Sequence, residues 1–141
     1  MNHIELFSGC GGLSLGLEQS GFELTMANEL SPMAAESFAY NFFNENLEEL
    51  ARTDLQAENT LWLNSNFSNL KPRLRENPFT FPALDAEGIS DIPQNIIDLQ
   101  GKLVVGSIVE LNRLVDSNKE LVGQLRTAFG SERGLDLVSG G

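Results

Sequence analysis

The sequence predicts an α/β protein with a mostly parallel sheet. Two observations carry this prediction. Short apolar runs alternate with helix-periodic stretches, and a glycine-rich loop follows the first apolar run. The alternation is clear in residues 1–43 and returns in residues 101–141. With 141 residues, of which 41% are apolar, the chain has the size of one domain with a substantial core.

Residues 1–43 contain two strand–helix units. The predicted elements are strands at 3–7 and 22–28, a loop at 8–12, a helix at 13–20 that Gly21 closes, and a second helix after residue 31. Ser31-Pro32 is typical of a helix start, because serine caps the first turn and proline suits its first position. Short links between such units predict a βαβ arrangement, and therefore parallel strands.

Residues 44–100 interrupt this pattern. Prolines and asparagines punctuate the segment, and residues 44–59 carry five acidic side chains that suit a solvated helix. We expect an insertion between βα units rather than a part of the sheet repeat. Lys71, Arg73 and Arg75 are expected to form a solvated face, and contact with nucleic acid is the less favoured interpretation of this basic cluster.

In residues 101–141 the strand–helix pattern returns. The predicted elements are a strand at 102–105, a turn at 106–108, a helix at 109–115, a further helix from 117 or 118 to 129, and a strand at 135–138. The predicted sheet therefore has four strands. Glycines that follow a parallel strand, as at Gly140 and Gly141, normally begin a functional loop.

Charge and composition limit the classes of function. The net charge of −11 opposes contact with a phosphate backbone, so we expect this chain alone to bind DNA poorly. No apolar run reaches the ~18 residues that a membrane span needs, and no signal peptide is predicted. A single cysteine excludes an internal disulfide and fits a reducing compartment. We expect a cytoplasmic protein without membrane contact and without a metal site.

The glycine-rich run that begins at Phe7 predicts a site for a nucleotide-like cofactor. Its glycines permit positive φ and let a ligand approach backbone N–H groups. Gly9 and Gly11 fit the first two glycines of a dinucleotide fingerprint, but Ser14 stands at the third, so a diphosphate ligand fits less well. Glu29 lies 20 residues after Gly9, where a carboxylate can accept both ribose hydroxyls.

Four ordered motifs resemble those of DNA (cytosine-5)-methyltransferases, which bind S-adenosylmethionine. Residues 5–13 are similar to the first motif, 27–32 to the second, 104–108 to the third and 136–141 to the approach to the fourth. Residues 44–100 lie outside the resemblance. It implies a Rossmann-like S-adenosylmethionine-dependent methyltransferase fold, truncated and with an inserted segment. It also implies a bacterial restriction–modification enzyme that methylates C5 of cytosine in DNA.

The resemblance further implies roles for particular residues. Phe7 would pack on the adenine, and the loop would cradle the methionine moiety with Ser8, Gly9, Cys10, Gly11 and Gly12. Leu13, which follows the loop, would also belong to the cofactor site. Glu29 would bind the ribose hydroxyls, and Leu30 would cover the other side of the adenine. Ser107 stands where the family commonly has an aspartate that accepts from the adenine amino group, and Ile108 follows it in the cofactor site. A hydroxyl still accepts a hydrogen bond there, although without charge.

The resemblance implies no catalytic residue in this chain. In the family the fourth motif continues into Pro-Pro-Cys, whose thiolate adds to the flipped cytosine ring, and the sequence stops one step before it. Cys10 lies in the cofactor loop and is not expected to act as the nucleophile. We therefore expect the isolated chain to be inactive and DNA to be bound through the missing C-terminal part.

Three other interpretations stay open. The chain could be a subunit of a split methyltransferase, and the exposed edge of the truncated sheet would then pair with a complementary chain or with a second copy. It could be a non-catalytic module that binds S-adenosylmethionine. It could also be a fragment of a nucleotide-dependent oxidoreductase, although Ser14 in place of the third glycine argues against that class.

Overall fold

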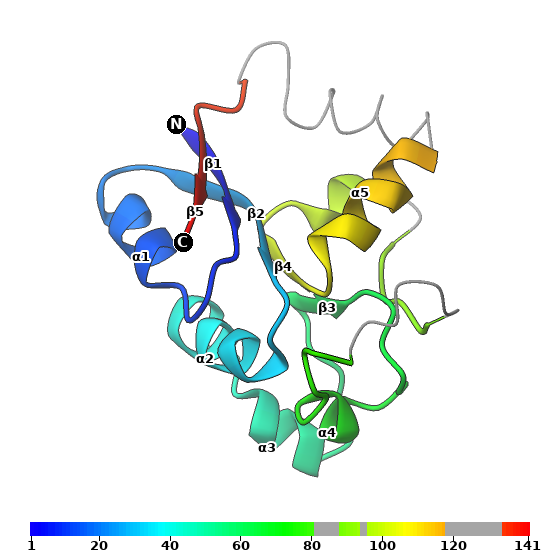
Figure 1. Ribbon diagram of the computed structural model, residues 1–141. Helices are drawn as coiled ribbons and strands as arrows, with labels where there is room; N and C mark the ends of the chain where they lie inside the picture. Colours follow the sequence, from blue (N-terminus) through cyan, green and yellow to red (C-terminus); the bar gives the residue numbers. More distant parts are fainter. Residues whose placement is uncertain (81–87, 94–95, 118–133) are drawn as a thin grey trace.

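A parallel sheet of five strands forms the centre of the protein (Figure 1). The computed structural model describes residues 1–80, 88–93, 96–117 and 134–141. Its strands are β1 (Asn2–Leu6), β2 (Glu23–Glu29), β3 (Thr60–Trp62), β4 (Lys102–Val105) and β5 (Leu137–Gly140). They lie in the order β3-β4-β2-β1-β5, and every pairing between neighbours is parallel. The predicted α/β class with a parallel sheet is confirmed.

The order of the strands places a topological switch point beside β1. The chain winds away from β1 through β2, β3 and β4, and then returns to the opposite side of β1 as β5. Leu6 of β1 consequently pairs with Asn28 of β2 on one side and with Gly140 of β5 on the other. In open α/β sheets, ligands bind in the crevice at the carboxyl ends of the strands next to such a switch. The loop that follows β1 lies at this crevice.

Helices cover both faces of the sheet. They are α1 (Gly12–Gln19), α2 (Pro32–Phe43), α3 (Leu47–Arg52), α4 (Leu70–Arg73) and α5 (Ile108–Ser117), with a 3-10 turn η1 (Ile96–Leu99). The start of α2 is the one that the sequence predicts, since the Ser31 hydroxyl accepts from the Ala34 N–H at 3.4 Å and Pro32 is the first residue. Within the described ranges, no helix is long and apolar enough to cross a membrane.

Two apolar clusters hold the layers together. One packs α2 against the sheet around Phe38, Trp62 and Leu103, and the other packs α5 around Val104 and Leu111. Leu103 and Val104 are neighbours in β4 and belong to different clusters, because successive side chains of a strand point to opposite faces. α2 and α5 therefore lie on opposite sides of the sheet (Figure 1).

The prediction of four strands is wrong, because the segment expected as an insertion supplies a fifth. β3 lies within residues 44–100 and pairs with β4 from Thr60↔Leu103 to Trp62↔Val105. It has three residues, so its sequence is too short to show the alternation of a strand. The helix expected within residues 44–59 is present as α3, over Leu47–Arg52.

The predicted solvated face at Lys71, Arg73 and Arg75 also needs correction. Arg73 is 2% exposed, its Nη1 lies 2.6 Å from Asp91 Oδ2, and its guanidinium stacks on the Trp62 ring at 5.6 Å. Its Nε donates to the Phe67 carbonyl at 2.7 Å. The partners are distant in sequence, so local charge patterning does not reveal them.

The third part of the chain follows the prediction where it is described. The strand expected at 102–105 is β4, the helix expected at 109–115 is α5, and the strand expected at 135–138 is β5, shifted toward the C-terminus. The further helix predicted up to residue 129 lies outside the described residues.

Candidate functional site

The loop between β1 and α1 has an unusual backbone. Phe7, Gly9 and Gly11 have φ angles of 55°, 54° and 86°, all in the left-handed region. Glycine adopts such angles freely, whereas a residue such as phenylalanine is held there at a cost of about 1 kcal/mol or more. Phe7 is nevertheless 53% exposed. The strained residue thus presents an aromatic ring at the carboxyl end of the central strand, where a ligand can stack on it.

Helix α2 supports the loop from below. A Cβ added to Gly11 would lie 2.8 Å from Cδ2 of the buried Phe38, so only glycine lets the loop pack this closely. Asn41 Nδ2 donates to the Cys10 carbonyl at 3.4 Å. In contrast, a Cβ on Gly9 or Gly12 would meet no atom within 4 Å. The loop is therefore fixed on one side and open on the other, as a cradle for a ligand requires.

Glu29, at the end of β2, lies directly against this loop. Its Oε2 accepts from the Gly9 N–H at 2.7 Å, and its Oε1 accepts from the Ser31 N–H at 2.8 Å. Each carboxylate oxygen keeps a further lone pair, so the group can accept ribose hydroxyls in addition. The structure thus places Glu29 and the glycine loop in contact, as the spacing of 20 residues between Gly9 and Glu29 suggests.

A second carboxylate, Glu5, lies beneath the loop. Glu5 is 2% exposed, and its Oε2 accepts a hydrogen bond from the hydroxyl of Ser14, which is fully buried in α1. Burial raises the pKa of Glu5, and hydrogen bonds from Ser14 oppose the rise. Glu5 is not among the site residues that the sequence predicts. The available signal was a charged residue inside an otherwise buried central strand, with Ser14 at the position of an expected glycine.

The loop after β4 completes the edge. The Gly106 N–H donates to the Glu29 carbonyl at 2.9 Å, and Asn28 Nδ2 donates to the carbonyls of Val104 and Gly106, each at 3.0 Å. Ser107 follows and is buried, and its hydroxyl oxygen accepts from the Val109 N–H at 3.1 Å, where it caps α5. Its own O–H remains available as a donor. Ser107 is therefore linked to the glycine loop through Gly106 and Glu29.

The predicted site residues gather at one edge of the sheet. The loop from Phe7 to Leu13 follows β1, Glu29 and Leu30 end β2, and Ser107 and Ile108 follow β4. Leu13 and Leu30 are 46% and 37% exposed, so both present apolar surface there. A Cβ on Gly140 would lie 3.5 Å from Phe7 Cδ2, which places the end of β5 beside the same ring. The described residues contain no group of His, Cys, Asp and Glu that could hold a metal ion.

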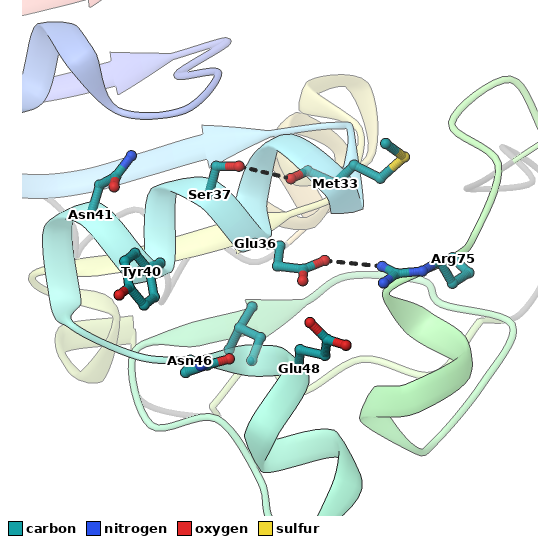
Figure 2. A pocket seen from close by; sticks show the side chains of 9 residues that line it. Met33, Glu36, Ser37, Tyr40, Asn41, Asn46, Glu48 and Arg75 are labelled. Atoms are coloured by element: carbon teal, nitrogen blue, oxygen red, sulfur yellow. Dashed lines mark hydrogen bonds and ion pairs between the residues drawn. The ribbon is translucent and has the colours of Figure 1, made fainter.

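A separate hollow of about 800 Å³ lies on the outer side of α2 (Figure 2). An ion pair between Glu36 and Arg75, at 3.0 Å, crosses it, and Tyr40 and Asn46 contribute to its wall. No residue of the glycine loop lines this hollow, and neither does Glu29. Asn41 of α2, which donates to the Cys10 carbonyl, is part of its wall. The predicted cofactor-binding residues lie at the carboxyl edge of the sheet, so the hollow is not the predicted cofactor site.

The fold and the site define a class of protein. A parallel sheet, a switch point beside the central strand, a glycine loop and an acidic residue at the end of the second strand are those of a Rossmann-like methyltransferase fold. Residues 1–65 match the family model of the C-5 cytosine-specific DNA methylases. The resemblance to this family is confirmed over that part, which is just under half of the chain.

Curated proteins with similar sequences carry related names. The chain is 55% identical over 38 residues to the type II methyltransferase M.NgoFVII of Neisseria gonorrhoeae, covering 27% of this chain and 10% of that protein. It is 34% identical over 82 residues to the putative type II methyltransferase M.MjaORF1200P of Methanocaldococcus jannaschii, covering 58% of this chain and 20% of that protein. It is 42% identical over 55 residues to the type II methyltransferase M.HgiGI of Herpetosiphon aurantiacus, covering 38% of this chain and 44% of that protein.

The chain thus spans a small part of the length of the first two relatives. No solved structure matches it.

Proposed function

We propose that this chain is the S-adenosylmethionine-binding N-terminal part of a DNA (cytosine-5)-methyltransferase of a restriction–modification system. The observation that carries the proposal is the contact between Glu29 and Gly9, at 2.7 Å, beside a loop that is open to solvent. The match of residues 1–65 to the C-5 cytosine-specific DNA methylases supports it. So do the type II methyltransferase names of the relatives.

The roles of the residues follow from their positions. Glu29 would accept the ribose hydroxyls, and the exposed ring of Phe7 would stack on the adenine, with Leu30 on its other side. The loop from Ser8 to Gly12 would border the methionine moiety, because the space beside Gly9 and Gly12 is open. The N–H groups of Ser8, Gly9 and Gly11 already donate to Asn28, Glu29 and Ser8, so they would shape the loop rather than bind the ligand. Ser107 and Ile108 would border the adenine amino group. When bound, S-adenosylmethionine supplies the methyl group as an activated sulfonium.

The nucleophile of the reaction would come from outside these 141 residues. The single cysteine of the sequence, Cys10, is exposed in the cofactor loop, and its carbonyl is bound by Asn41. A thiol there would lie beside the cofactor rather than beside a flipped base. The net charge of −11 also assigns DNA binding to another part of the enzyme. The free thiol fits the reducing cytoplasm that we propose for this chain.

Titration calorimetry with two cofactors tests the proposal. We expect the purified chain to bind S-adenosylmethionine and not NAD, and to transfer no methyl group to DNA on its own. Binding of NAD in preference would support the oxidoreductase class instead. Methylation of cytosine by the pure chain would refute the assignment of the nucleophile to another part.

A subunit of a split enzyme is the second candidate, and β5 favours it. Among the described residues, β5 is an edge strand that pairs only with β1, and its Val138 is 56% exposed. An uncovered edge can accept a strand of a complementary chain or of a second copy. Mixing the chain with one that begins at the Pro-Pro-Cys motif should then restore methylation. Cofactor binding without such restoration would favour a non-catalytic binding module.

A further inference from the structure

Glu5 and Ser14 form a buried hydrogen bond, and neither residue is among those proposed to contact the cofactor. Both residues are almost completely inaccessible, at 2% and 0% exposure. Burial of a carboxylate is costly unless its oxygens are hydrogen-bonded, and here the Ser14 hydroxyl donates to Oε2. A carboxylate retained at such a position in the central strand therefore needs an explanation beyond filling the core.

The position of the pair supplies one. Glu5 lies near the end of β1, and Ser14 lies in the first turn of α1, so the bond joins the two sides of the glycine loop. The residue that caps α1 is Gly11, which makes no side-chain cap. The Glu5 carboxylate accepts from the Ser14 hydroxyl in this first turn, and a carboxylate next to the N-terminus of a helix is favourable. Glu5 thus ties the first turn of α1 to the neighbouring strand through the Ser14 hydroxyl.

The two carboxylates of the site hold different halves of the loop. Glu29 binds the N–H of Gly9, in the half that follows Phe7. Glu5 binds Ser14, in the half where Gly11 turns into the helix. A loop with several glycines has high conformational freedom, so its shape before binding depends on such anchors.

We propose that Glu5 and Ser14 are positioning residues that hold the half of the loop from Gly11 to Ser14 in the shape that receives the methionine moiety. This inference rests on the proposed function, because the loop must bind S-adenosylmethionine. It explains why serine occupies the position of the third glycine in a dinucleotide fingerprint. At that position the serine binds the strand through a hydrogen bond instead of through close backbone packing.

The test compares two ligands, S-adenosylmethionine and adenosine, by calorimetry on the full 141-residue chain. Adenosine lacks the methionine moiety and contacts only the half of the site near Phe7 and Glu29. We expect Ser14→Ala to lower the affinity for S-adenosylmethionine at least about tenfold and to leave adenosine affinity unchanged, since a hydrogen bond to a charged group is lost. Glu5→Gln keeps an acceptor oxygen for Ser14 and should retain most of the binding.

Ser65→Ala is the matched control. Ser65 is also fully buried and donates to a buried carboxylate, Glu76 Oε2, at 2.7 Å, but this pair lies beyond β3. The Ser65→Ala variant should lower the melting temperature as Ser14→Ala does. It should leave the affinities for S-adenosylmethionine and for adenosine unchanged. If Ser14→Ala melts below the assay temperature, the double variant Ser14→Ala with Glu5→Gln replaces it, because that variant has no unpaired buried charge. We expect the same loss of affinity for S-adenosylmethionine.

Two results would overturn the inference while the proposed function stands. Ser14→Ala could bind both ligands like the unchanged chain, or it could lose affinity for both by the same factor, which indicates a general structural role. Failure of the unchanged chain to bind S-adenosylmethionine would instead overturn the proposed function itself.

Discussion

The carboxylate of Glu29 accepts a hydrogen bond from the backbone N–H of Gly9, at 2.7 Å, across the ends of two adjacent strands. The same carboxylate accepts from Ser31 at the start of α2. One side chain therefore connects the glycine loop, the second strand and the helix that follows. Any ligand that occupies the loop contacts a group whose orientation is already fixed, so little ordering is needed on binding.

Glu29→Ala should weaken binding of S-adenosylmethionine. The ribose would lose a charge-assisted hydrogen bond worth roughly 1.5–3 kcal/mol, which corresponds to a loss of affinity of about tenfold or more. Calorimetry measures the change. Glu48→Ala is the matched control, because Glu48 is an exposed acid that pairs with Arg52 along α3. Equal affinities of the Glu29 variant and the unchanged chain would remove Glu29 from the site.

Gly11→Ala should destabilise the protein. The φ of Gly11 is 86°, and the new Cβ would lie 2.8 Å from the ring of Phe38 in the core. We expect a loss of about 1–3 kcal/mol in the free energy of unfolding, measured with urea.

Gly16→Ala is the matched control for that change. Gly16 lies within α1, and its added Cβ would meet no atom within 4 Å. This variant should gain about 0.5–1 kcal/mol, because alanine loses less backbone entropy in a helix. A neutral Gly11→Ala would show that the loop does not need its close packing on α2.

The loop and its acidic partner could be predicted because their signals are local. The strand, the glycines, Ser31-Pro32 and Glu29 all lie within residues 1–43, and each follows from a backbone rule that short sequence windows express. The contact of Glu29 with Gly9 needed only the expectation that the two strands are parallel neighbours. The contacts of these residues and of Ser107 with a ligand stay predictions.

The contribution of residues 44–100 could not be predicted in the same way. β3 joins the sheet through β4, which lies 40 residues further along the chain, and three residues carry no visible period. Arg73 is ordinary in its local sequence, and its burial depends on Trp62 and Asp91 on either side. Long-range pairing of this kind is set by the packed structure and not by local propensity.

Arg73→Ala should be strongly destabilising. It would leave Asp91 without its ion pair and expose the Trp62 ring that the guanidinium covers. We expect a loss of about 2–3 kcal/mol, because the lost hydrogen bonds involve charged groups and the site is largely buried. Arg75→Ala breaks an ion pair of a mostly exposed arginine with Glu36 and should cost less than about 1 kcal/mol. Similar losses for the two variants in urea denaturation would contradict the burial of Arg73.

The stability of the protein should fall as the pH decreases below 6.5, because of His3. The residue is completely buried in β1, and neither ring nitrogen has a hydrogen-bond partner among the residues that the structure describes. Burial lowers its pKa below the ordinary value of 6.5, and Glu18 opposes the shift only in part. The folded state therefore favours neutral His3. Its contribution is fully present above pH 6.5 and is lost as the pH falls from there toward the lowered pKa.

Melting temperatures between about pH 8 and about pH 5.5 measure this effect, which has a limiting slope of about 1.4 kcal/mol per pH unit for one proton. His3 is the only histidine of the sequence, so no other imidazole contributes in this range. The variant His3→Leu should keep an apolar contact with the Phe22 ring and lose most of the pH dependence. An equal slope in the variant would mean that another group takes up the proton, and that the folded state tolerates charged His3.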